Sequence, residues 1–108
     1  MMSGSYYQMK VLRESSACRV CLEGDIDYAA SIDLSPELEE IVDECETELV
    51  FDLSEVTLID SEGIKALMAA YSAMQAKGKR VRVVNCSQPA LRVLQLVGVD
   101  DMLGVSTG

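Results

Sequence analysis

The chain has 108 residues, of which 49% are hydrophobic, and this size and composition are typical of one globular domain with its own core. Nine basic and eighteen acidic residues give a formal net charge of -9, which disfavours binding to nucleic acid or to an anionic membrane surface. The apolar runs are too short to cross a membrane, and residues 1–10 lack the pattern of a signal peptide. We therefore expect a single domain over residues 1–108, without membrane insertion and located in the cytoplasm.

Two strands are predicted near the N-terminus, at Tyr6–Leu12 and Ala17–Gly24, joined by a turn into a hairpin. Within the second strand, Cys18 and Cys21 form a C-x-x-C motif, which in other settings binds zinc or carries out redox chemistry. Residues three apart in a strand point to opposite faces, so these two thiols are not expected to share a metal ion or form a disulfide. We expect reduced cysteines with a packing role, and neither a metal site nor a cofactor.

A first helix is predicted over Ser35–Cys45, because its apolar residues repeat at helical spacing. Ser35 is expected to cap this helix, and Pro36 suits its first position. Residues Tyr28–Leu34 are expected to form a separate turn, because a proline in the interior would break one continuous helix.

The segment Leu49–Leu53 is almost continuously apolar, which predicts a central strand that is covered on both faces. Val81–Asn85 resembles this segment, and Met102–Ser106 is predicted as a weak last strand. A second helix is expected to begin near Ser61, and a third is expected over Ser87–Val97. The alternation of strand and helix patterns predicts an α/β domain with a mixed sheet.

A C-x5-R motif runs from Cys86 to Arg92, and cysteine phosphatases and some sulfurtransferases use this spacing to hold an oxyanion near a thiolate. This loop contains no glycine, and Pro89 has no N–H group to offer an anion. The chain also contains no histidine, which excludes Ser-His-Asp and Cys-His catalytic groups. We therefore expect a protein that is not an enzyme, with a phosphatase or sulfurtransferase-like enzyme as a minor alternative.

The predicted central strand Leu49–Leu53 is followed by a connection in which Val56, Leu58 and Ile59 remain apolar, and Asp60–Gly63 lies where the second helix begins. Either Asp60 or Ser61 is expected to be the N-cap, Glu62 is favoured by the helix dipole, and Gly63 allows close packing. A phosphate on Ser61 would lie at the positive end of the helix dipole, so it would change the surface charge without unfolding the domain.

Three segments together resemble the STAS domain of the anti-sigma-factor antagonist type. They are LEGDIDYAAS, LVFDLSEVTLIDSEGIKAL and AKGKRVRVVNCSQPALRVLQLVGVDDML, so the resemblance extends from about Leu22 to Leu103. It implies a STAS-type fold, in which a small sheet of about five strands carries helices mainly on one face. It also implies a protein that binds an anti-sigma factor, itself an ATP-binding serine kinase, and thereby releases a sigma factor to regulate transcription.

By motif position, the resemblance implies that Ser61 is phosphorylated and that a metal-dependent serine phosphatase resets it. The implied partner-binding residues are Asp27, Asp60, Ser61, Glu62 and Gly63. The family usually has a small or hydroxyl residue where Glu62 stands, and this fixed carboxylate is expected to oppose phosphorylation nearby. STAS domains also serve in lipid or ABC transport systems and in stressosome-like assemblies, and the fold alone does not choose among these roles.

Overall fold

The computed structural model describes residues 7–100 and 102–104, and within them four strands form one mixed sheet. The sheet order is β1-β2-β3-β4, where β1 and β2 are antiparallel and the other two pairs are parallel. In chain order the elements are β1 (Tyr7–Arg13), β2 (Ala17–Ile26), α1 (Tyr28–Glu44), β3 (Glu48–Ile59), α2 (Ser61–Ala76), β4 (Val81–Val84) and α3 (Gln88–Leu96). The structure therefore confirms the predicted α/β domain with its N-terminal hairpin.

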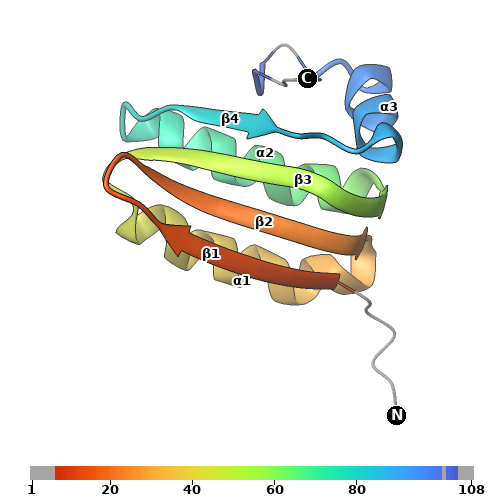
Figure 1. The fold of residues 1–108 in the computed structure, drawn as a ribbon, viewed down its shortest axis with the longest axis horizontal. Coiled ribbons are helices and arrows are strands. Elements are labelled where there is room, and N and C mark those ends of the chain that lie inside the picture. Colours follow the sequence, from red (N-terminus) through yellow and green to blue (C-terminus); the bar gives the residue numbers. More distant parts are fainter. Residues whose placement is uncertain (1–6, 101, 105–108) are drawn as a thin grey trace.

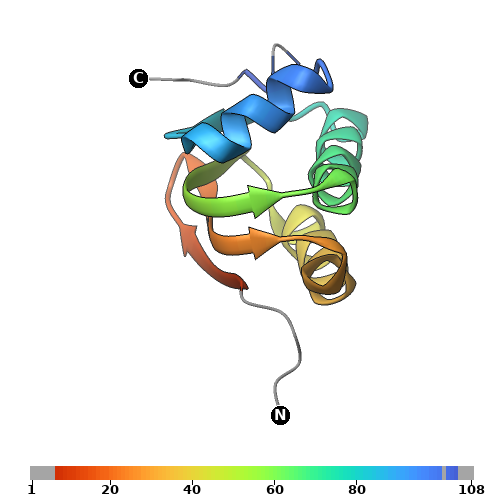
Figure 2. The ribbon, with the colours of Figure 1, turned by 90° about the vertical axis from the view of Figure 1, so that its right-hand side faces the viewer.

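Helices α1 and α2 lie side by side on one face of the sheet (Figure 2), and α3 lies beyond the C-terminal end of β4 (Figure 1). The sheet contributes Val20, Phe51 and Val83 to the core, three fully buried residues that are neighbours across β2, β3 and β4. Leu49 and Leu53 are also fully buried. The central strand was therefore predicted correctly from its apolar sequence.

Strand β3 is longer than the predicted segment, because it continues to Ile59. Residues 55–59 pair with residues 23–26 of β2, with one irregularity in the register just before this stretch and a second within it, between Gly24 and Asp25. These irregularities keep Val56 and Ile59 buried while Thr57 and Leu58 are exposed. The segment that the sequence indicated as a connection to α2 is thus mostly strand.

The prediction of a separate turn before Pro36 was wrong, because α1 is one helix with Pro36 in its interior. Ser35 is accordingly not its N-cap. A proline cannot donate the usual hydrogen bond to the carbonyl of Ile32, but both residues are exposed, where water can bind that carbonyl. The buried side chains of Leu34 and Leu38 on either side of Pro36 hold the helix against the sheet and α2.

The predicted fifth strand at Met102–Ser106 is not formed over residues 102–104, and residues 105–106 lie outside the described part of the chain. Residues 102–104 form a turn in which Leu103 is fully buried. The amide of Leu103 donates to the carbonyl of Val99, and its carbonyl accepts from the amide of Val83 on β4, each over 3.0 Å. A turn therefore covers part of the edge of β4 where a strand was expected.

Lys77, which follows α2, ties the C-terminal end of α1 to the rest of the domain. Its Nζ donates to the carbonyls of Val42 over 2.6 Å and of Cys45 over 2.7 Å. A third contact reaches the carbonyl of Asp43 over 3.4 Å. Carbonyls at a helix C-terminus lack partners within the helix, so the lysine supplies both hydrogen bonds and a favourable charge.

None of the helices in the described ranges has the length and apolar character needed to cross a membrane.

Candidate functional site

The N-termini of α1 and α2 lie at the same edge of the sheet, where the parallel strands β2 and β3 end (Figure 1). Two hydrogen bonds hold them together, one between backbone groups and one from a backbone amide to a side-chain carboxylate. The amide of Asp60 donates to the carbonyl of Ile26 over 3.2 Å, and the amide of Tyr28 donates to Oδ2 of Asp60 over 3.2 Å. Asp27 caps α1 through a hydrogen bond from the amide of Ala30 to its Oδ1 over 3.0 Å. The structure thus brings Asp27 and Asp60, far apart in the sequence, to one edge.

Asp60, and not Ser61, is the N-cap of α2. Its Oδ1 accepts hydrogen bonds from the amides of Glu62 over 2.9 Å and Gly63 over 3.0 Å. Ser61 is the first residue of the helix and is exposed. Its hydroxyl makes no hydrogen bond to any of the described residues, so it is free to contact a partner or to be modified.

Gly63 allows α2 to pack closely against the end of β2. A Cβ atom at this position would lie 2.2 Å from the carbonyl oxygen of Ile26 and 2.9 Å from Cγ1 of Ile59. Both distances are far below van der Waals contact, so only glycine fits without a shift of the backbone. Gly63 is also buried, and we therefore assign it to positioning α2 and Ser61 rather than to direct contact with a partner.

Glu62 forms an ion pair with Lys65, with 3.2 Å between its Oε2 and the lysine Nζ. The charge of Glu62 was predicted to oppose phosphorylation of Ser61, and the cation at Lys65 was missed. Lys65 follows Ser61 by four residues, a spacing that places two side chains on the same face of a helix. That spacing was visible in the sequence and could have revealed a cation within reach of a group on Ser61.

The C-x5-R motif does not form an anion-binding loop. The amide of Ser87 donates to the carbonyl of Leu53 over 3.1 Å, and its hydroxyl donates to the carbonyl of Val56 over 2.7 Å. Ser87 also caps α3, as predicted, by accepting from the amide of Ala90 over 3.3 Å. Burial raises the pKa of Cys86 to about 11, so at neutral pH its sulfur is a thiol and not a nucleophilic thiolate.

Cys18 and Cys21 lie on opposite faces of β2, as their spacing predicted. Cys18 is the neighbour of Leu49 and packs against the core on the helix-covered side, whereas Cys21 is the neighbour of Asp52 on the other side. Burial raises the pKa of both thiols. Within residues 7–100 and 102–104, no three cysteine, aspartate or glutamate side chains are arranged to hold a metal ion.

Comparison with known structures gives close matches to this fold. An anti-sigma factor antagonist from Mycobacterium paratuberculosis has a TM-score of 0.85 at 24% sequence identity, with 100% of this chain and 92% of that chain covered. Bacillus SpoIIAA, an anti-sigma factor antagonist in its unphosphorylated form, has a TM-score of 0.76 at 16% identity, covering 94% and 89%. An anti-sigma-factor antagonist STAS domain from Rhodobacter sphaeroides has a TM-score of 0.65 at 22% identity, covering 77% and 90%.

At these identities the likeness shows a shared fold. No curated protein matches the chain significantly. The sequence model of the family described as "Mlab, STAS domain" matches residues 9–104, which is nearly the whole of the described chain. The family match and the arrangement of strands and helices agree, and the chain belongs to the STAS domain family.

Proposed function

We propose that this chain is an anti-sigma factor antagonist, a binding module without catalysis of its own, and that its binding is switched by phosphorylation of Ser61. The single observation that carries the switch is the free, exposed hydroxyl of Ser61 at the start of α2. Anti-sigma factor antagonists among the structures of the same fold support the proposal. The partner is a cognate anti-sigma factor with an ATP-binding serine kinase fold, and the outcome of its capture is a released sigma factor.

In the proposed modification, Oγ of Ser61 attacks the γ-phosphorus of ATP bound by the kinase. A new P–O bond forms, the bond to the β-phosphate breaks, ADP leaves, and a base of the kinase takes the hydroxyl proton. Both carboxylate oxygens of Asp60 accept backbone hydrogen bonds, so we assign Asp60 a positioning role and the base to the kinase. The role of Asp60 is to fix the start of α2 so that the Ser61 side chain points outward. A metal-dependent serine phosphatase later removes the phosphate and restores the hydroxyl.

The phosphate would oppose docking through its charge. It carries about -1.5 to -2 at pH 7, whereas the hydroxyl that it replaces is neutral. Lys65 pairs with Glu62 in the unmodified protein, and it lies where it can turn to a phosphate on Ser61 instead. The phosphate would therefore be tolerated on the helix while Glu62 and the phosphate together present a negative surface to the partner.

The test is incubation with ATP and a kinase-type anti-sigma factor of the same organism, followed by mass spectrometry to map the modified residue. Ser61→Ala should bind the kinase but resist phosphorylation, and Ser61→Asp should bind at least about tenfold more weakly, a difference of 1.4 kcal/mol. Glu62→Ser should raise the phosphorylation rate if Glu62 opposes the reaction. Phosphate on another residue, or equal binding by Ser61→Ala and Ser61→Asp, would contradict the switch.

A second candidate function is the STAS subunit of a lipid or ABC transport system. We retain it because the family model that matches the chain is named for Mlab and not for an anti-sigma factor antagonist. In this role the same edge with Asp27, Asp60 and Ser61 would contact a transporter subunit. Co-purification of the tagged chain with an ABC transporter, and not with a kinase, would favour this candidate.

A further inference from the structure

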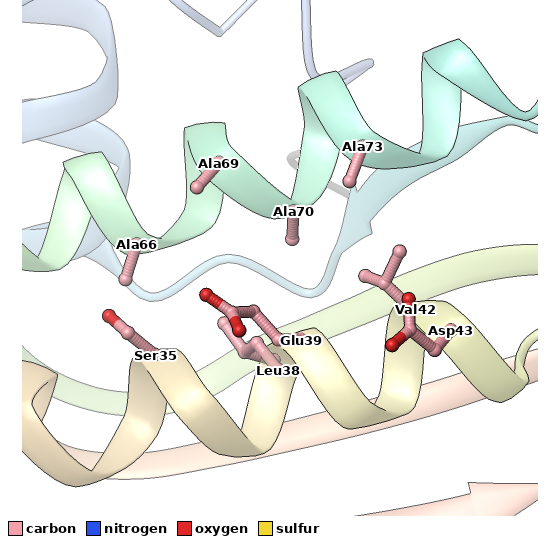
Figure 3. A pocket seen from close by; sticks show the side chains of 9 residues that line it. All are labelled: Ser35, Leu38, Glu39, Val42, Asp43, Ala66, Ala69, Ala70 and Ala73. Carbon is pink, nitrogen blue, oxygen red and sulfur yellow. The ribbon is translucent and has the colours of Figure 1, made fainter.

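A groove of about 300 Å³ runs between α1 and α2 on the outer side of the two helices (Figure 3). Its floor is apolar and buried, and is formed by Leu38, Val42, Ala66 and Ala70. All the residues of α2 that line the groove are alanines, whose methyl groups are short. The groove is present because these small side chains do not fill the space between the two helices. Protein interiors and stable interfaces are close-packed, and an unfilled apolar groove of this size is a candidate contact surface.

The stripe of α1 that lines the groove continues along the helix toward the edge that carries Ser61. Tyr28, Ile32, Ser35 and Glu39 follow one another at spacings of three or four residues, so they lie along one stripe of α1. Tyr28 is 63% exposed and Ile32 is 58% exposed, so two large apolar side chains extend the groove toward the N-termini of both helices. The amide of Tyr28 donates to Oδ2 of Asp60, so the N-terminal end of this stripe lies beside the start of α2, where Ser61 follows.

The exposed rim of the groove on α1 is acidic. Glu39 and Asp43 line it, and both side chains are exposed. Neither carboxylate has an ion-pair partner among the described residues, whereas Glu62 at the start of α2 is paired with Lys65. Helix α1 contains no basic residue, and the Lys77 ammonium is held by carbonyls at its C-terminal end, so a partner with basic side chains would complement Glu39 and Asp43.

Resting on the function proposed above, we propose that the anti-sigma factor places one amphipathic helix in the groove between α1 and α2. Its small or apolar side chains would lie on the alanine-lined floor, and Lys or Arg side chains at one edge would pair with Glu39 and Asp43. This contact is separate from the one at Ser61, which the nucleotide-binding part of the same partner would make.

A helix suits this groove better than an extended segment. From Tyr28 to Asp43 the stripe is roughly 22 Å long at 1.5 Å per residue, which matches a helix of about four turns. The exposed methyl groups of Ala69 and Ala73 allow a third helix to approach to about 8–10 Å between axes, the usual distance of packed helices. The backbone groups of both flanking helices are already hydrogen-bonded, so they offer no edge for a strand.

The test measures the dissociation constant between variants of this chain and the kinase-type anti-sigma factor of the test above, in the presence of an ATP analogue. Glu39→Lys should weaken binding about tenfold at low salt, and the effect should shrink as salt is added. Glu40→Lys is the matched control, because it makes the same charge change at the next residue, which is exposed and does not line the groove. It should change binding less than about twofold.

A second pair of variants tests the filling of the groove without any change of charge. Ala69→Phe places a ring in the groove, whereas Ser72→Phe adds the same ring at an exposed position of α2 that does not line it. Ala69→Phe should weaken binding about tenfold or more, and Ser72→Phe should bind like the wild type. Both positions are exposed, so both variants should keep the melting temperature of the parent.

The outcomes distinguish the proposed groove contact from the proposed phosphorylation switch at Ser61. Equal effects of Glu39→Lys and Glu40→Lys, or normal binding by Ala69→Phe, would overturn the groove contact. If those variants bind normally while Ser61→Asp does not, the proposed function stands and only the groove contact falls. Loss of binding in the groove variants with normal binding by Ser61→Asp would support the groove and refute the switch. If the wild-type chain does not bind the kinase at all, both proposals fail.

Discussion

Replacing Gly63 by alanine should destabilise the domain, although alanine is normally the better helix residue. The added Cβ would lie 2.2 Å from the carbonyl oxygen of Ile26, whereas ordinary van der Waals contact begins at 3.4 Å. Because that oxygen belongs to the backbone of β2, no side-chain rotation can relieve the clash, and α2 must move away from the sheet. The carbonyl also accepts the hydrogen bond from the amide of Asp60, so the movement would disturb the start of the helix.

Two opposing effects set the size of the change. Alanine gains about 1 kcal/mol over glycine in a helix interior. Overpacking of a close-packed site costs about 1–3 kcal/mol, and more when backbone must shift. We expect the backbone clash to lie above the upper end of that range and to give a net loss of about 2–3 kcal/mol in the free energy of unfolding. For a domain of this size, that loss corresponds to a fall of roughly 10–20 °C in melting temperature.

Urea denaturation followed by circular dichroism measures this loss, and Gly78→Ala is the matched control. Gly78 has a φ of +73°, but a Cβ at that position would have no atom within 4 Å. Its replacement should cost only about 1 kcal/mol, from the left-handed backbone conformation. If Gly63→Ala were as stable as the wild type, or more stable than Gly78→Ala, the close approach of α2 to β2 would be wrong, and with it our account of how Ser61 is positioned.

Three further predictions concern other parts of the chain. Lys77→Met should lower the free energy of unfolding by about 2 kcal/mol, because it removes the hydrogen bonds from the ammonium to the carbonyls of Val42 and Cys45 at the end of α1. Lys65→Met should cost less than about 0.5 kcal/mol, and similar losses in urea melts would contradict the capping role. Burial raises the pKa of Cys86 to about 11, so iodoacetamide should alkylate its thiol slowly at pH 8 and faster as the pH rises toward 11. Rapid labelling at pH 8 would contradict the burial of this thiol. Pro36→Ala should raise the free energy of unfolding by about 1–2 kcal/mol, since the alanine amide can donate the helical hydrogen bond to the carbonyl of Ile32. A loss of stability in the same urea melts would show that the proline fits α1 without cost.

The elements that could be predicted from the sequence are those whose pattern is local. Leu49–Leu53 is apolar at every position but one, and Ser87 lies before a clear amphipathic helix, so both were placed correctly. The interior proline of α1 was misjudged because the local cost of Pro36 is offset by burial of Leu34 and Leu38, and that burial depends on the sheet and on α2.

The parts of the candidate site that could not be predicted depend on contacts between distant segments. Gly63 was expected to allow close packing, but its neighbour Ile26 lies 37 positions earlier in the sequence and comes close only through the parallel pairing of β2 with β3. The choice of Asp60 over Ser61 as N-cap likewise depends on where the chain leaves β3. The groove requires the faces of α1 and α2 to be set side by side, and no single segment carries a signal for it.

The identity of the N-cap decides what a phosphate on Ser61 can do to the domain. If Ser61 itself capped α2, a phosphate would have to replace the hydroxyl as an acceptor, and the start of the helix would rearrange with every cycle of modification. Because Asp60 already accepts from the amides of Glu62 and Gly63, the helix start is complete without Ser61. A phosphate on Ser61, as proposed above, would then add charge outside an intact cap, and its effect would be confined to the surface that a partner meets. A switch of this kind changes affinity without drawing on the stability of the fold, which suits a small domain with only about 5–15 kcal/mol of stability in total.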